Sequence, residues 1–404
     1  MVRVISVEHH RAEVTALLGT RTPVRLPVAE CAGLILAEDV TADVSLPPFD
    51  NSAMDGYAVR AVDVAGASED SPVTLPVAED IPAGRVDSPP LLPGTAHRIM
   101  TGAPMPPGAD TVVMVEKTDG GAETVRVFAS VPPGNHLRRT GEDVQRGTTA
   151  LTRGTLLGPA QVGLAAAVGL DSLVVFTPPR VLVVSTGSEL VTAPNPLKHG
   201  QIYESNSVML VAALRALGCE VETIRSVVDD VAEFRAVIEP KLAAADLLIT
   251  SGGVSAGAYE VVKDALTGAG VEFRKVAMQP GGPQGLGRWN GVPVFTLPGN
   301  PVSSLVSFEV FVRPAVLAAM GHSIVDRPRV RAKLTEALRS PAGKVQFRRG
   351  FYSHTDGEVT GEVGPRGGPG SHLLAAFAQA NCLIVLPEEV TEAPQGAEVN
   401  VLLL

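Results

Sequence analysis

The chain has few aromatic residues, few cysteines and an excess of acidic over basic residues. Only 4% of its 404 residues are aromatic, and Trp289 is the sole tryptophan. Cys31, Cys219 and Cys382 are odd in number and far apart. This pattern favours buried free thiols of a reducing compartment over a disulfide framework or a cysteine metal site. The net charge of −10 argues against binding to nucleic acid or to an anionic membrane.

Several common signatures are missing as well. The chain has neither an uninterrupted apolar run of about 18 residues nor an opening signal segment, so we expect a cytoplasmic protein without a membrane span. It lacks GxxxxGK[ST] and GxGxxG, which argues against an ordinary P-loop or Rossmann dinucleotide site. Its eight histidines are scattered. Carboxylates are therefore the available ligands for a metal ion, and they suit Mg²⁺.

The residues that are present divide the chain into segments, and its length allows about two to four domains. Strands and helices alternate over 180–321, which predicts a doubly wound parallel sheet. Short strands between Pro/Gly turns predict a small inserted β domain over 58–137 and a β barrel or sandwich after a linker at 326–328. We also expect a helix over 6–18, capped by Ser6 and stopped by Gly19, and a short helix over 29–37.

The most informative stretch is 247–257. Leu247 to Thr250 reads as a strand buried on both faces. It breaks into a loop of Ser251, Gly252, Gly253 and Ser255, and a helix can follow. A strand, a Gly/Ser loop and a helix N-terminus together form an anion site, because the first N–H groups of a helix lack partners. The alternative is a tight βα turn without a ligand.

Two more strands end in loops of the same kind. Ser185, Thr186 and Gly187 follow the strand that begins at Arg180, and Pro298, Gly299 and Asn300 follow the strand over 292–297. In an open α/β sheet, ligands bind outside the carboxyl ends of the strands. Three such loops on one sheet favour a phosphate or oxyanion site over three ligand-free turns.

The acids that could hold Mg²⁺ lie on four separate loops, at Asp55, Asp143, Glu189 and Asp229. They could meet only if domains or two subunits pack together. For residues 50–55 the alternative is an Asx-type turn network. For residues 135–143 it is a solvated loop with weak surface ion pairs.

Seven motifs together resemble the molybdopterin molybdenumtransferases, a family that includes the E domain of gephyrin. They are Ser52–Ala58, Ile99–Pro104, Arg138–Asp143, Ser185–Leu190, Thr250–Gly257, Leu297–Val302 and Gly370–His372. The resemblance implies an α/β multidomain fold. Its N-terminal α/β domain is discontinuous, over 1–50 and 138–176, and is interrupted by the β domain at 51–137. The molybdopterin-binding domain covers 177–325 and the C-terminal β barrel 326–404. A homodimer shares its active cleft between subunits.

The resemblance also implies a reaction. Adenylylated molybdopterin and molybdate react with Mg²⁺, AMP is released, and molybdenum is placed on the dithiolene sulfurs. Asp55, Asp143, Glu189 and Asp229 would hold or orient Mg²⁺ and water, and Thr101, Arg138 and Ser371 would line the cleft. Ser251, Gly252, Gly253 and Ser255 would cradle the terminal phosphate of molybdopterin. The upstream adenylyltransferase and the acceptor molybdoenzymes are the expected protein partners.

The sequence departs from the family pattern in two places. Ala258 stands where an acidic residue commonly precedes the tyrosine, and Gln279 and Gly282 replace the two lysines of a Lys-Pro-Gly-Lys-Pro run. These changes affect the expected molybdate contacts. Two other functions are open: a non-catalytic scaffold that binds molybdopterin or peptides, and a pyrophosphohydrolase acting on another adenylylated ligand.

Overall fold

A computed structural model describes residues 4–227, 230–252, 261–354 and 360–404. The chain forms two compact units. One comprises the segment up to Val24 together with Phe176–Leu404, and the other comprises Arg25–Val175. Residues 4–24 therefore pack with the central sheet in the first unit. The predicted domain boundaries, including the discontinuous N-terminal domain, stay predictions.

The first unit is built on a seven-stranded sheet in the order β1-β19-β21-β22-β18-β14-β17. The strands are β1 (Val4–Ile5), β14 (Arg180–Thr186), β17 (Glu220–Val227), β18 (Leu247–Ser251), β19 (Val271–Val276), β21 (Pro283–Trp289) and β22 (Val292–Leu297). The pairs β17–β14, β14–β18, β18–β22 and β1–β19 are parallel, whereas β21 is antiparallel to both of its neighbours. The predicted α/β fold is confirmed, with one antiparallel strand that the sequence did not reveal.

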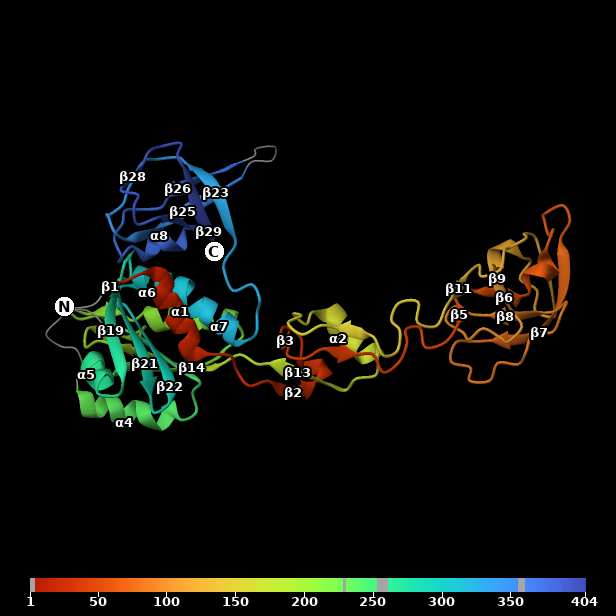
Figure 1. Ribbon diagram of the computed structural model, residues 1–404, viewed down its shortest axis with the longest axis horizontal. Helices are drawn as coiled ribbons and strands as arrows, with labels where there is room; N and C mark the ends of the chain where they lie inside the picture. Colours follow the sequence, from red (N-terminus) through yellow and green to blue (C-terminus); the bar gives the residue numbers. More distant parts are fainter. Residues whose placement is uncertain (1–3, 228–229, 253–260, 355–359) are drawn as a thin grey trace. The chain divides into compact units, whose positions relative to one another are not determined.

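Each face of this sheet carries its own hydrophobic core. Because side chains alternate along a strand, Val181 and Val183 of β14 enter one core, while Leu182 and Val184 enter the other. Helices α4 (Val231–Leu242) and α5 (Val261–Thr267) cover the second face, as Figure 1 shows. Helices α1 (Val7–Leu18), α3 (Asn206–Ala216), α6 (Pro301–Ser307) and α7 (Arg313–Ala319) cover the first. The sheet is therefore doubly wound.

The only tryptophan anchors the core beneath α4. Trp289, at the end of β21, is 2% exposed. Its ring stacks on Phe234 of α4 with centroids 6.1 Å apart, and the Arg235 guanidinium lies 5.8 Å from its centroid. Stacked aromatic and cation–π contacts add to the energy of area burial. This cluster fixes α4 against β21.

Helices α6 and α7 are joined by a π-helical turn at Phe308–Val312 into one run from Pro301 to Ala319. Pro314 has no N–H to donate, so the carbonyl of Val310 loses its α-helical partner there. The run is apolar and long enough to cross a membrane, but 83% of its most apolar window is buried inside the fold. That burial is typical of a core helix.

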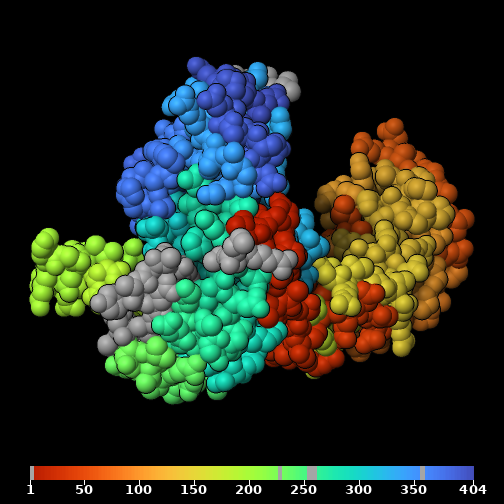
Figure 2. All heavy atoms as spheres, turned by 60° about the vertical axis from the view of Figure 1, so that its left-hand side comes forward, coloured from red at the N-terminus to blue at the C-terminus, as the bar shows by residue number. Residues whose placement is uncertain are grey.

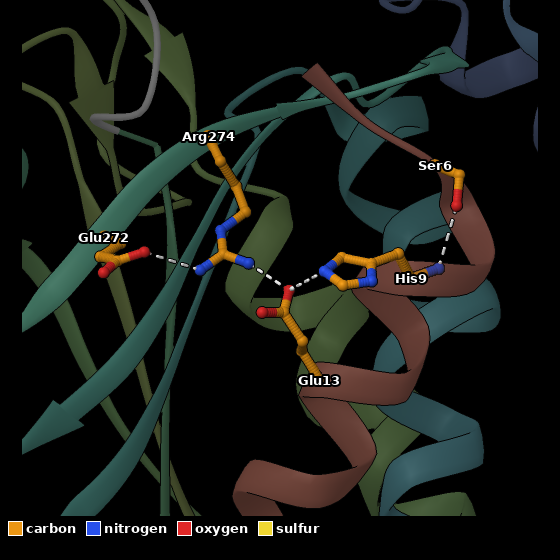
Figure 3. A network of polar contacts seen from close by, with 5 residues as sticks. All are labelled: Ser6, His9, Glu13, Glu272 and Arg274. Atoms are coloured by element: carbon orange, nitrogen blue, oxygen red, sulfur yellow. Dashed lines mark hydrogen bonds and ion pairs between the residues drawn. The ribbon is translucent and has the colours of Figure 1, made fainter. Parts of the chain in front are cut away.

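The N-terminal segment is tied to the central sheet by polar contacts as well as by packing. Ser6 caps α1 by accepting from the His9 N–H, and Gly19 ends the helix, as predicted. Figure 3 shows Glu13 of α1 bound to the Arg274 guanidinium of β19, which also donates to Glu272 at 3.0 Å. His10, one turn before Glu13 on the same helix, is buried with its ring edge-on to Phe311 at 4.7 Å. Helix α1 is thus held by packing as well as by ion pairs.

The C-terminal region of this unit is the predicted β barrel. It closes through β25-β26-β23-β29-β27 and back to β25. The strands are β23 (Arg329–Leu334), β25 (Val345–Ser353), β26 (Gly361–Pro365), β27 (Cys382–Leu386) and β29 (Glu398–Leu403), with α8 (Leu374–Ala378) nearby. β20 (Met278–Gln279), from the central domain, pairs in parallel with the start of β25. The barrel and the central domain therefore share backbone hydrogen bonds.

The second unit contains the predicted inserted β domain. Its five-stranded sheet runs in the order β10-β7-β8-β6-β9. The strands are β6 (Gly56–Val59), β7 (Val73–Ile81), β8 (Ala96–Ile99), β9 (Thr111–Met114) and β10 (Thr124–Val127). Only glycine fits at Gly56, because an added Cβ would lie 2.0 Å from the Val113 carbonyl oxygen. The glycine after Asp55 therefore allows β6 and β9 to approach closely.

The rest of the second unit consists of short strands and one helix. They are β2 (Val24–Pro27), β3 (Ile35–Leu36), β4 (Val40–Thr41), β5 (Asn51–Ser52), β11 (Leu137–Arg138), β12 (Thr149–Leu151), β13 (Ser172–Phe176) and α2 (Pro159–Ala167). The helix expected over 29–37 is wrong. The chain makes a single 3₁₀ turn at Val28–Glu30 and then turns at Gly33, whose φ of 84° a right-handed helix cannot accommodate.

Candidate functional site

The three Ser/Thr/Gly loops lie side by side at the carboxyl edge of the central sheet. β14 and β18 are paired at Ser185 and Ser251, and β18 and β22 are paired at Ser251 and Leu297. The last residues of the three strands are thus neighbours across the sheet. The convergence that the sequence predicts is present in the structure, although the roles of the individual residues remain predictions.

The loop residues divide into a buried layer and an exposed layer. Ser185 and Ser251 are each 1% exposed and Pro298 is buried, while Thr186 and Gly187 are partly exposed. Gly299 and Asn300 are exposed. The buried hydroxyls therefore support the loops from below. A ligand that approaches this edge meets Thr186–Gly187 and Gly299–Asn300.

Gly252 shapes the edge through its backbone. Its φ of 102° disfavours other residues, and an added Cβ would lie 2.9 Å from the Thr186 carbonyl oxygen. Its N–H, which we expected to face a ligand, donates to the Leu297 carbonyl at 3.1 Å. Gly252 thus allows the β14 and β22 loops to close around it. Gly253 and Ser255 lie outside the described residues.

A buried carboxylate that sequence reasoning missed connects the first loop to α3. Glu204 is 8% exposed and accepts from the Ser185 hydroxyl at 3.0 Å. It also accepts from the N–H and the hydroxyl of Ser207, at 2.7 and 2.5 Å. Three donors compensate the burial of its charge. Glu204 therefore fixes the end of β14 against the first turn of α3.

Asn206, two residues further on, connects the other two loops. Its Nδ2 donates to the Ser251 hydroxyl at 2.9 Å and to the Gly299 carbonyl at 2.6 Å. A polar residue between a short strand and a helix was the available signal for both Glu204 and Asn206. That signal also fits simple helix capping, so it did not mark either residue as part of the site.

Ser371 comes to this edge from the barrel. Its carbonyl accepts the N–H of Val302, in the first turn of α6, at 3.1 Å. The preceding loop is held by Arg349, which is 3% exposed and donates to the carbonyls of Gly368 and Gly370. Burial lowers the pKa of Arg349, and the nearby Arg348 charge adds to this effect. The sequence offered no signal for Arg349.

In the second unit the predicted pair Asp55 and Thr101 is in direct contact. The side chain of Asp55 is exposed, and one of its oxygens accepts from both the N–H and the hydroxyl of Thr101. These donors, the backbone N–H above all, lower the pKa of Asp55. Asp55 is therefore an ionised carboxylate held in one orientation. Arg138, in β11, and Asp143 are also exposed.

The expected turn network around Asp55 is only partly local. The Ser52 hydroxyl donates to the Met54 carbonyl, as in a local turn. Asp50 instead accepts from the N–H and the hydroxyl of Thr140, and it pairs with Arg139 at 2.8 Å. The loop containing Asp55 is thus anchored to the loop that follows Arg138.

The four predicted magnesium ligands fall in different parts of the chain, and their common role stays a prediction. Asp55 and Asp143 belong to the second unit and Glu189 to the first, while Asp229 lies outside the described residues. No group of three potential metal-binding side chains occurs among the described residues. Glu189 is exposed, and its carboxylate lies close to the backbone of Gly187. A Cβ added to Gly187 would lie 2.5 Å from Oε2 of Glu189.

The segment next to Glu189 stands out from the central domain. It carries the short pair β15 (Leu190–Val191) and β16 (Ile202–Tyr203), and Figure 2 shows it as a yellow-green projection. Leu197, Ile202 and Tyr203 are exposed on it. The segment links the Thr186–Gly187 loop directly to Glu204.

Gln279 and Gly282 provide no cation where we expected the molybdate contact. The Oε1 of Gln279 accepts from the Gln346 amide at 2.8 Å, across the β20–β25 pairing. Gly282 lies just before β21, and an added Cβ there would be 3.3 Å from the Val276 carbonyl oxygen. Ala258 lies outside the described residues. The described part of this site therefore has hydrogen-bonding groups but no lysine at these two positions.

Three family models match the chain in order. The MoeA N-terminal region (domain I and II) matches residues 5–169, the probable molybdopterin binding domain matches 182–318, and the MoeA C-terminal region (domain IV) matches 331–404. Molybdopterin molybdenumtransferase 2 of Mycobacterium tuberculosis is 54% identical over 403 residues, 98% of each chain. The chain belongs to the molybdopterin molybdenumtransferase family. The resemblance inferred from the motifs is confirmed.

Further members of the family agree along the whole chain. The molybdopterin molybdenumtransferase of Haemophilus influenzae is 38% identical over 380 residues, covering 93% of this chain and 92% of its own. The crystal structure of a molybdopterin biosynthesis MoeA protein from Pyrococcus horikoshii matches 99% of both chains with a TM-score of 0.84 and 32% identity. The family is one of transferases, so the chain is an enzyme of that class.

Proposed function

We propose that this protein inserts molybdenum from molybdate into adenylylated molybdopterin, in a Mg²⁺-dependent reaction that releases AMP. The observation that carries the proposal is the convergence of three polar strand-end loops, at Ser185, Ser251 and Leu297, in the domain that matches the molybdopterin-binding model. The carboxyl edge of an α/β sheet is where such folds bind ligands. Family membership supplies the substrate class.

The chain's own residues would act as follows. The exposed layer of Thr186–Gly187 and Gly299–Asn300 binds the phosphate end of molybdopterin, supported by the buried Ser185 and Ser251. Ser371, bonded to the first turn of α6, lines the same edge from the barrel. Arg138 supplies positive charge to the pyrophosphate. Thr101 holds Asp55 ionised and oriented, which suits a carboxylate that positions water or a cation.

The acid set fits Mg²⁺ by chemistry, because hard oxygen ligands suit that ion. Asp55, Asp143, Glu189 and Asp229 would hold it, with substrate phosphate and water completing its coordination. Mg²⁺ would supply neutralisation of the charge that develops on the pyrophosphate. Since the acids fall in two compact units, we propose a homodimer whose cleft combines one unit from each subunit.

The proposal includes a cytoplasmic location. Cys31, Cys219 and Cys382 are all free and buried, which suits a reducing compartment. Burial raises the pKa of Cys219 and of Cys382 to about 12, so both thiols stay protonated and unreactive. The upstream adenylyltransferase and the acceptor molybdoenzymes are the protein partners that this reaction requires.

One experiment separates the proposed function from its alternatives. The purified protein is given adenylylated molybdopterin, Mg²⁺ and molybdate, and both AMP and dithiolene-bound molybdenum are measured. Release of both products supports the transferase. AMP without bound molybdenum identifies a pyrophosphohydrolase, and binding without either product identifies a scaffold.

A further inference from the structure

The side chain of Asn206 bonds to residues at the ends of both β18 and β22. Its amide nitrogen lies 2.9 Å from the Ser251 hydroxyl oxygen and 2.6 Å from the Gly299 carbonyl oxygen. Ser251 ends β18, and Gly299 follows β22. One amide group therefore bridges two neighbouring strand-end loops, next to the backbone pairing of Ser251 with Leu297.

The orientation of this amide follows from its partners. The Gly299 carbonyl can only accept, so the atom beside it must be the NH₂ group of Asn206. This leaves Oδ1 of Asn206 buried and without a hydrogen-bond donor among the described residues. A buried acceptor without a partner is unfavourable. In this arrangement Nδ2 of Asn206 donates two hydrogen bonds while Oδ1 accepts none from the described residues.

Beyond the backbone pairing of β18 with β14 and β22, the residues that Asn206 contacts have few other close side-chain contacts. The Ser251 hydroxyl has two other protein partners, the Pro298 carbonyl and the Ser304 hydroxyl, each at 3.5 Å. Those distances are long for O–H···O hydrogen bonds. Gly299 has no side chain with which to hold its own loop. Asn206 therefore makes the short side-chain contacts that join Gly299 to Ser251, in addition to the backbone bonds from Gly252 to Leu297 and from Ser304 to Asn300.

Asn206 is itself anchored through Glu204. The Glu204 carboxylate holds both the end of β14, through Ser185, and the first turn of α3, through Ser207. The segment Glu204–Ser207 thus links all three strand-end loops to the start of one helix. Displacement of that turn would move the three loops relative to one another.

We propose that Asn206 is a positioning residue for substrate binding. It sets the spacing between the Gly299–Asn300 loop and the Ser251 loop, and with it the fit of the phosphate end of the molybdopterin substrate. The inference rests on the proposed function for the identity of that substrate. It assigns Asn206 no contact with the substrate and no part in the chemical step.

The test compares Asn206→Ala with Val208→Ala in the intact protein. Val208 lies two residues further along α3 and is 52% exposed, so its truncation controls for a lost side chain on the same helix. With adenylylated molybdopterin as substrate, Asn206→Ala raises KM about tenfold, a loss of about 1.4 kcal/mol in binding, and changes kcat less than about twofold. Val208→Ala leaves both unchanged. An unchanged KM in Asn206→Ala, or a loss confined to kcat, overturns the inference.

A second pair of variants keeps the inference testable if Asn206→Ala does not fold. Asn206→Ser keeps a short hydrogen-bond donor at the first residue of α3, so KM rises by less than in the alanine variant. Asn206→Asp removes the donor and places a carboxylate oxygen against the Gly299 carbonyl, so KM rises by more. If the aspartate and serine variants have the same KM, the contact with Gly299 does not set substrate affinity and the inference fails.

A measurement on the free protein separates this inference from the proposed function. Hydrogen exchange of the peptide that contains Gly299 and Asn300 should be faster in Asn206→Ala than in the wild type or in Val208→Ala. Unchanged exchange overturns the positioning role whatever the substrate is. A wild-type protein without activity on adenylylated molybdopterin, combined with faster exchange in the variant, refutes the proposed function and leaves the positioning role in place.

Discussion

The N–H and the hydroxyl of Thr101 donate to the same carboxylate oxygen of Asp55, at 2.7 and 2.8 Å. Thr140 makes the same two bonds to one oxygen of Asp50, at 2.8 and 2.9 Å. The two acids lie five residues apart, on either side of β5, and have equivalent local partners. Only Asp55 belongs to the predicted catalytic set, so the pair provides a matched comparison.

Asp55→Asn should keep the fold and lose activity. An asparagine oxygen can accept both bonds from Thr101, so the loop is preserved while the charge is removed. We expect AMP release to fall by about 10²-fold or more, as for the loss of a positioned catalytic group. Asp50→Asn should reduce activity far less, because only an exposed ion pair with Arg139 is lost. Wild-type turnover in Asp55→Asn would remove Asp55 from the mechanism.

The protein should be a two-fold homodimer with a buried interface of roughly 2,000 Å² or more. Light scattering at micromolar concentration measures the mass. A stable, active monomer would contradict the shared cleft. Asp55 and Glu189 lie in different units of the chain, which permits a sharper test.

In that test, Asp55→Asn and Glu189→Gln subunits, each inactive alone, are mixed and allowed to exchange. Each mixed dimer then contains one cleft without either substitution, and about a quarter of wild-type activity should return. If the cleft is formed within one subunit, no activity returns. Mixing each variant with itself is the control.

Stability should fall between pH 7 and pH 5 because of His10. Burial, with the positive charges of Arg274 and His9, lowers the pKa of His10 to about 3. Below pH 6.5 the unfolded chain therefore binds a proton that the folded chain does not, so stability declines as the pH falls toward 3. From pH 7 to pH 5 the loss is roughly 2 kcal/mol.

Urea unfolding of wild type and His10→Leu at the two pH values measures this loss. The variant has no titrating group at the site, so its stability should depend less on pH by roughly 2 kcal/mol. His9→Gln is the control, because the neighbouring His9 is exposed and makes only a 3.7 Å surface ion pair with Glu13. An equal pH dependence in wild type and His10→Leu would show that the fold does not lower the pKa of His10.

Gly282→Lys should lower the molybdate requirement for molybdenum insertion about tenfold. Molybdate is a dianion, and a nearby ammonium retains roughly 1–2 kcal/mol of attraction after screening and desolvation. Gly282 has an ordinary backbone conformation, and an added Cβ needs the Val276 carbonyl, 3.3 Å away, to yield by a few tenths of an ångström. Gly282→Gln supplies length without charge. Overlapping molybdate titrations for Gly282→Lys, Gly282→Gln and wild type would show that other groups bind the anion.

The sequence predicted the parts of the site that follow from strand order. Parallel strands place their carboxyl ends on one edge, so the loops after Thr186, Ser251 and Leu297 had to be neighbours if the sheet was doubly wound. Strand β21 was missed because its glycines resemble a turn. In the structure Gly285 and Gly287 are required by close packing, since an added Cβ at Gly285 would lie 1.9 Å from Thr296 Oγ1.

The cross-links beneath the loops could not be predicted in the same way. Glu204 and Asn206 join residues 19 to 93 positions apart, and only the assembled sheet brings those residues together. The burial of Ser185 and Ser251 could not be predicted either, because their loops are uniformly polar in the sequence. The burial of Arg349 depends on the path of the Gly368–Gly370 loop, which no local pattern specifies.

The position of Trp289 gives the protein an intrinsic optical label. The indole is packed between β21 and α4, away from water, so its fluorescence should be blue-shifted in the folded protein and should move to longer wavelength when that layer opens. The second unit contains no tryptophan. A denaturation curve followed by tryptophan emission therefore records the central domain alone. Unfolding of the inserted β domain has to be followed by a signal other than tryptophan emission.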